Sequence, residues 1–157
     1  MKLENEVCSK ELALELKELG VKQESVFYYG KDSWRGFQQA DGILFYKNLN
    51  VDEHSYEIHC SAFTFAELGA ILPNAIVLKN EEPFDNFKLS INKFISVENN
   101  AQVDNWMINY ECDSTDATGE NAWLRRRLTT NIYDPNAANG MAKMLIYLIE
   151  NKLIELP

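Results

Sequence analysis

One cluster of residues in the sequence has the side chains needed to bind an anion. Arg125, Arg126 and Arg127 are consecutive and follow Trp123. On a strand, Arg125 and Arg127 would share a face, where two guanidinium groups beside an indole can hold a phosphate or carboxylate or stack on a base. The interpretation we favour is structural: the arginines neutralise the acidic loop Asp113–Glu120 across a hairpin.

A second group of residues with binding potential is aromatic and lies in the first predicted hairpin. Because side chains alternate on a strand, either Tyr28 or its two neighbours would be left exposed, and an exposed ring can anchor a partner protein. Tyr28 and Trp34 are the candidates. The alternative, which is the more common arrangement, is that the rings cover the end of a sheet. The full group is Phe27, Tyr28, Tyr29, Trp34 and Phe37.

Metal and nucleophilic chemistry find little support in the sequence. On a strand, His54 and Cys60 would share one face while His59 points to the other, and Cys112 is distant in sequence. This arrangement suits neither a tetrahedral metal site nor a Cys–His pair. The phosphate-loop, dinucleotide-binding and nucleophile-elbow motifs are absent. We therefore predict no cofactor, no metal and no catalytic residue, and we do not favour an enzyme.

Charge and composition narrow the class of protein. The 157 residues carry a formal charge of −9, and the segment 80–121 alone carries −7 from nine acids and two lysines. This charge disfavours non-specific nucleic-acid binding and docking on an anionic membrane. Three cysteines, an odd number with no CxxC pair, argue against a disulfide framework. With no apolar signal segment, we expect a soluble cytoplasmic protein.

Two of three predicted helices have clear end signals. Ser9 can cap the first helix, and Gly20 follows it at the position that favours a left-handed backbone. Thr64 and Glu67 form the pattern of a capping box at the start of the second. The helices are expected at about 9–19, 64–72 and 135–151.

The third helix is predicted to be the main core helix. Asp134 is expected to cap it, with Pro135 at its first position. Gly140 lies within its apolar stripe and costs roughly 1 kcal/mol relative to alanine.

The remaining segments predict strands. Arranged with the helices, they indicate a single α+β domain over residues 1–157, with a mainly antiparallel sheet of about five to seven strands and the helices packed on one face. Residues 120–128 could instead form a short helix. The predicted strands are 25–29, 43–47, 55–60, 75–78, 87–97, 106–112 and 122–130.

Three segments of the sequence carry a resemblance to known proteins. SKELALELKELGVKQES (9–25), SAFTFAELGAILP (61–73) and GMAKMLIYLIENKLI (140–154) resemble blocks of small uncharacterised phage and prophage proteins. The resemblance covers about a third of the chain, and it implies a mobile-element origin and a cytoplasmic setting. It implies no activity and no functional residue.

Together these observations favour a non-enzymatic interaction protein that acts on a host or phage protein. The alternative is a protein that binds or sequesters a nucleotide-like anion, or a simple hydrolase, with Trp123, Arg125 and Arg127 at its site. A special case of the first is an acidic mimic of nucleic acid. A third hypothesis is an accessory subunit whose fold is completed by homo-oligomerisation.

Overall fold

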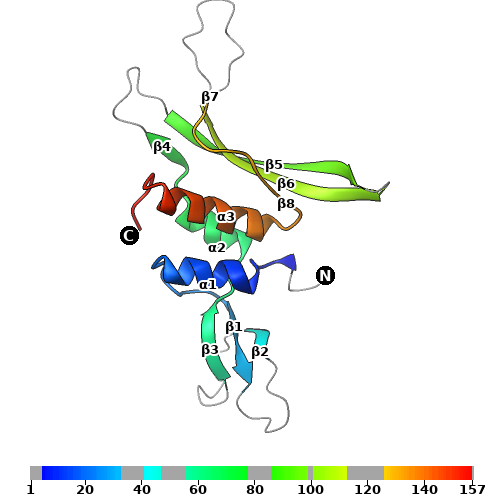
Figure 1. The fold of residues 1–157 in the computed structure, drawn as a ribbon, viewed down its shortest axis with the longest axis vertical. Helices are drawn as coiled ribbons and strands as arrows, with labels where there is room; N and C mark the ends of the chain where they lie inside the picture. The colour runs from blue at the N-terminus through cyan, green and yellow to red at the C-terminus, as the bar shows by residue number, and fades with distance from the viewer. Residues whose placement is uncertain are drawn as a thin grey trace, which may run out of the picture.

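The computed structural model of the protein describes residues 5–32, 41–46, 56–77, 86–98, 101–112 and 126–156, which form three helices and eight strands (Figure 1). The helices are α1 (Lys10–Glu18), α2 (Phe65–Ile71) and α3 (Ala137–Glu150). The strands are β1 (Phe27–Asp32), β2 (Asp41–Tyr46), β3 (Tyr56–Ser61), β4 (Ala75–Val77), β5 (Asn86–Glu98), β6 (Ala101–Cys112), β7 (Arg126–Arg127) and β8 (Ile132–Asp134).

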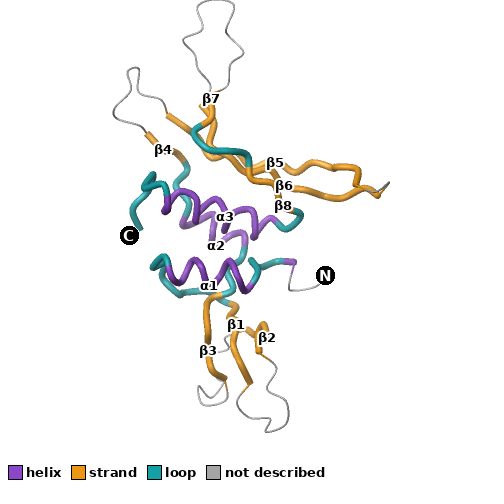
Figure 2. Tube along the Cα trace, viewed as in Figure 1, coloured by secondary structure: helices purple, strands orange, loops and turns teal. Residues whose placement is uncertain are grey.

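The helices lie between two antiparallel sheets (Figure 2). The small sheet has the order β2-β1-β3, and the large sheet has the order β4-β5-β6-β7, with β8 also paired to β6. The α+β class, the antiparallel pairing and the three helices predicted from the sequence are confirmed. The sequence pattern did not reveal that the strands divide between two sheets. Among the described residues, no helix combines the length and apolar character needed to cross a membrane.

The helix ends follow local signals in the sequence, with one correction. The Ser9 and Thr64 side chains cap α1 and α2, and the capping box between Thr64 and Glu67 is complete. The predicted cap of α3 at Asp134 is wrong, because Asn136 occupies that position and its side chain accepts from the N–H groups of residues 138 and 139. Asp134 instead accepts from the Asn136 N–H at 2.8 Å and pairs with Lys143 at 2.7 Å. The turn formed by the Asp134 side chain delays the helix by two residues.

The three helix starts meet at one junction. The Cys8 N–H donates to the Phe63 carbonyl at 2.8 Å, which joins the segments that lead into α1 and α2. The Ser9 N–H donates to Asn139 Oδ1 at 2.7 Å, and Asn136 Nδ2 donates to the Val7 carbonyl at 3.0 Å. These hydrogen bonds join the segments that lead into the three helices.

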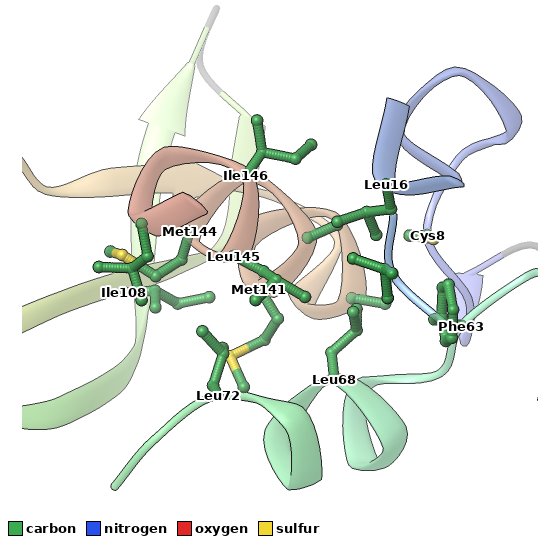
Figure 3. Packing of buried hydrophobic residues seen from close by; sticks show 14 of the residues in the cluster. Cys8, Leu16, Phe63, Leu68, Leu72, Ile108, Met141, Met144, Leu145 and Ile146 are labelled. Carbon is green, nitrogen blue, oxygen red and sulfur yellow. The ribbon is translucent and has the colours of Figure 1, made fainter. Parts of the chain in front are cut away.

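The core lies where α3 packs against the other helices and against β6 (Figure 3). Met141, Met144 and Leu145 of α3 are fully buried, as is Ile108 of β6. A Cβ atom at Gly140 would lie 2.7 Å from Ile108 Cδ1, which is closer than carbon atoms approach. Glycine at this position leaves room for the end of the Ile108 side chain against the helix.

The contact between Gly140 and Ile108 predicts opposite effects of alanine at two helical glycines. Gly140→Ala should lower the free energy of unfolding by up to about 2 kcal/mol, because overpacking costs ~1–3 kcal/mol and the helix gains ~1 kcal/mol. Gly69→Ala should be stabilising by about 1 kcal/mol, since its new Cβ would lie 3.5 Å from Met141 Cε, an ordinary contact. Urea denaturation measures both.

A variant of Ile108 tests whether the contact with its Cδ1 atom causes the loss of stability. Ile108→Val removes the obstructing Cδ1 atom, so the cost of Gly140→Ala should shrink or reverse in that background. An unchanged cost would contradict the steric explanation.

The Glu67 carboxylate ties α2 to the segment before β1. It accepts from the Thr64 N–H at 2.7 Å, the Val26 N–H at 2.9 Å and the Ser25 hydroxyl at 3.0 Å. Burial opposes ionisation of this group. The hydrogen bonds from the Thr64 and Val26 backbone and from the Thr64 and Ser25 hydroxyls nevertheless hold its pKa below the ordinary 4.5. The ionised form is therefore the one that the fold stabilises.

The lowered pKa of Glu67 predicts a specific pH dependence of stability. A carboxyl whose pKa is lowered on folding stabilises the fold above its unfolded pKa, and this contribution disappears as pH falls through the folded pKa. Wild type should exceed Glu67→Gln in unfolding free energy at neutral pH, with a difference that shrinks on acidification. Denaturant unfolding over a pH series measures it, with the exposed Glu18→Gln as control. A difference that is constant with pH would argue against this role.

Candidate protein-binding face

Most of the site residues predicted from the sequence fall outside the described part of the chain. Trp34, Trp123 and Arg125 lie there, as does the acidic loop 113–120. Arg127 is described through its backbone: it lies in β7, directly opposite Glu111 of β6. The segment 126–127 is thus a strand, as the hairpin prediction required.

Tyr28 is not the exposed anchor that the sequence suggested. Its side chain is only 6% exposed, and its hydroxyl accepts from the Ser25 N–H at 3.2 Å. Tyr29 is buried as well, and its hydroxyl donates to the Cys8 carbonyl at 2.8 Å. Strands β2 and β3 flank β1, so side chains from both neighbouring strands border those of β1 on each face of the sheet.

Two of the described thiols, those of Cys8 and Cys60, are held in a poorly reactive form. Cys8, Cys60 and Cys112 are free and buried. Burial raises the pKa of Cys8 to about 12 and also raises the pKa of Cys60. A thiol with a raised pKa stays protonated at neutral pH, and the protonated form is a poor nucleophile and metal ligand. Within the described residues, no cluster of His, Cys, Asp or Glu has metal-binding geometry.

The large sheet has an inner face that meets the helices and an outer face that does not. Ile91 pairs with Ile108, which contacts α3, so the odd residues of β5 and the even residues of β6 face inward. The alternate residues form what we call the outer face, which is rich in carboxamides, hydroxyls and exposed rings. It comprises Lys88, Ser90, Asn92, Phe94, Ser96, Val103, Asn105, Met107, Asn109, Glu111, Asn131 and Tyr133.

A chain of side-chain hydrogen bonds crosses the outer face. Asn109 Nδ2 donates to Asn131 Oδ1 at 2.9 Å, and Asn131 Nδ2 donates to the Tyr133 hydroxyl at 2.9 Å. Asn109 is fully buried, and its Oδ1 atom has no hydrogen-bond partner. Because the Tyr133 hydroxyl accepts from Asn131, its own proton is available for donation to a bound molecule.

Two aromatic rings form the centre of the outer face. Phe94 of β5 and Tyr133 of β8 flank β6 and meet edge to face across it, with ring centroids 5.8 Å apart. Tyr133 is 54% exposed, and Phe94 is also exposed. An edge-to-face pair fixes both rings. The result is a rigid apolar surface beside oriented polar groups.

Beyond the helices, β5 and β6 continue as a two-stranded ribbon, which projects from the body in Figure 1. Trp106 marks the boundary: Phe65 of α2 packs on it at 5.9 Å between ring centroids, and Lys93 lies over its ring. Lys93 also pairs with Asp104 at 2.7 Å. Past this point, Ile95 and Val97 still belong to the inner face of the sheet, but their side chains are 61% and 71% exposed.

Sequence reasoning missed Tyr133 because β8 is three residues long and follows the segment assigned to a hairpin. The signal that could have found it is the alternation of Ile132, Tyr133 and Asp134. On a strand, this alternation puts Tyr133 on one face and both Ile132 and Asp134 on the other. The assignment of Asp134 as a helix cap concealed this strand.

Comparisons of the chain with protein-family models, with curated proteins and with solved structures found no match. What the chain does is therefore inferred from its own residues and their geometry.

Proposed function

We propose that the chain is a non-enzymatic protein-binding module and that its outer face contacts the partner. The observation that carries the proposal is the exposed Tyr133 ring, which Phe94 fixes at 5.8 Å and whose hydroxyl Asn131 orients at 2.9 Å. Residues that bind other proteins most strongly are often rigid, exposed aromatic groups with a polar end.

The composition of the outer face supports a protein partner. Tyrosine provides a large contact area at low entropic cost, while serine and asparagine provide adaptable hydrogen bonds, as in antibody binding sites. Charged residues are few on this face: Lys88 and Glu111 lie opposite one another in the strand register, at its β7 end. A surface with few charges suits the centre of a protein interface.

The ionisable groups support binding over catalysis. General acids and bases need pKa values near neutrality. In the described residues, the resolved shifts move pKa values away from neutrality: burial raises the pKa of the Cys8 and Cys60 thiols and of the Tyr110 phenol, and hydrogen bonds lower the pKa of Glu11 and Glu67. These groups serve the fold.

The resemblance of the three helical blocks to phage and prophage proteins suggests the kind of partner. We propose a mobile-element origin, a cytoplasmic setting, and a host or phage protein as the molecule bound. The charge of −9 makes a basic or neutral partner surface more favourable than an acidic one.

The proposal predicts that partner capture depends on Tyr133. Tyr133→Ala should reduce the amount of partner recovered from a host lysate at least tenfold, because loss of a central aromatic anchor costs about 2 kcal/mol or more. Tyr133→Phe keeps the ring and loses only the hydroxyl, so its recovery should be intermediate. Quantitative mass spectrometry of the captured proteins measures the effect.

Tyr46 provides the matched control. It is 55% exposed and makes a similar edge-to-face contact with Phe27, at 5.8 Å, but it lies in the small sheet. Tyr46→Ala should leave partner recovery unchanged. Equal losses for Tyr46→Ala and Tyr133→Ala, or no partner enriched by the wild-type protein, would refute the assignment of this face.

A further inference from the structure

The edge of β5 that lies away from β6 is only partly covered. Strand β4 pairs with residues 86–88, and the Leu89 N–H donates to the Asn74 carbonyl at 3.0 Å. From Ser90 to Glu98, none of the described strands pairs with this edge, while the opposite edge pairs with β6 without interruption. An uncovered, regular strand edge is a template for another strand.

The backbone groups available at this edge follow from the Leu89 bond. In antiparallel pairing, the N–H and C=O of one residue point to the same edge, and successive residues alternate between edges. Because the Leu89 N–H points toward β4, the groups of Ile91, Lys93 and Ile95 point to the open side. These three residues offer three donors and three acceptors in a row.

The sequence of β5 reads almost the same in both directions about Lys93. Moving outward from Lys93, Asn92 corresponds to Phe94, Ile91 to Ile95, and Ser90 to Ser96. We propose that the β5 edge pairs with the β5 edge of a second copy of this chain, antiparallel, about a two-fold axis at Lys93. Ile91 then lies opposite the partner's Ile95, and Ser90 lies opposite the partner's Ser96.

Backbone direction agrees with this register. A two-fold axis in an antiparallel pair can pass through the centre of a hydrogen-bonded residue pair, which requires that the central residue point its N–H and C=O outward. Lys93 does so. The pairs 91–95, 93–93 and 95–91 then form a continuous ladder, which ends where Asn74 already occupies Leu89.

The charges at the axis are compatible with pairing. Two lysines directly opposite one another would repel, but each Lys93 is already paired with Asp104 of its own β6 at 2.7 Å. Each also lies over its own Trp106 ring, 5.8 Å from the centroid. The lysine charge is thus neutralised within each copy before the two edges meet.

Pairing also covers apolar side chains that the single chain leaves exposed. Ile95, at 61% exposure, would lie beside the partner's Ile91, and Val97, at 71%, would lie near its Leu89. Leu89 and Ile91 are half-buried on the inner face, against the core. The exposed ribbon of one copy would therefore extend the apolar inner face of the other.

The dimer goes beyond the proposed function and does not depend on it. The two-fold axis is perpendicular to the sheet, so both outer faces lie on the same side of one continuous sheet. Two Tyr133 anchors side by side would make partner binding bivalent.

Sedimentation velocity over a wide concentration range tests the dimer. Wild type should sediment as a dimer at high concentration. Lys93→Pro removes the N–H at the axis but no bond to β6, because proline is tolerated where the N–H faces outward, so this variant should be monomeric. Lys93→Ala keeps the N–H and should remain dimeric. A wild type that is monomeric throughout, or a dimeric Lys93→Pro variant, would overturn the proposal.

A cross-link tests the register without weakening the edge. Opposite residues of a hydrogen-bonded pair have Cα atoms about 5.5 Å apart, within the range of a disulfide. Lys93→Cys should therefore form a disulfide-linked dimer under mild oxidation. Asn92→Cys should cross-link at least tenfold less, because Asn92 faces Phe94 of the second copy. Equal cross-linking of the two variants would refute the two-fold axis at Lys93, even if a dimer forms.

Discussion

The close approach of α3 to β6 at Gly140 and Ile108 is the constraint on which the other features depend. A Cβ atom at residue 140 would lie 2.7 Å from Ile108 Cδ1, so a larger residue there would force the end of the Ile108 side chain to move. Ile108 is one of the buried residues through which the large sheet packs on the helices. Because the strands pair in a continuous register, burial of Ile108 places the odd residues of β5 on the inner face and the even residues on the outer face. The proposed outer face takes its orientation from this packing.

The length of the β5–β6 hairpin creates the second important feature. Strands of 13 and 12 residues are longer than the helices can cover, so the ribbon continues beyond Trp106. A two-stranded ribbon alone is marginally stable in water. Here the Lys93–Asp104 pair, the Lys93–Trp106 contact and the Phe94–Tyr133 pair stabilise its base. A ribbon stabilised in this way, with an open edge and exposed aliphatic side chains, is suited to association.

Local signals made the helices predictable from the sequence. The caps at Ser9 and Thr64 act within one turn, and the order of residues specifies them completely. The sheets depend on pairings between distant segments, which alternation does not reveal. The burial of Tyr28 follows from the pairing of β1 with β3, and the exposure of Tyr133 follows from the pairing of β8 with β6. The candidate site was missed for the same reason, although its residue types were visible.

Amide hydrogen exchange in β5 tests most directly the claim that the ribbon is an association element. The amides of Asn92, Phe94 and Ser96 point toward β6, and those of Ile91, Lys93 and Ile95 point to the open edge. At low protein concentration, only the first set should be protected from exchange. At high concentration, the second set should become protected as well. Fast exchange of Ile91, Lys93 and Ile95 at every concentration would contradict the account.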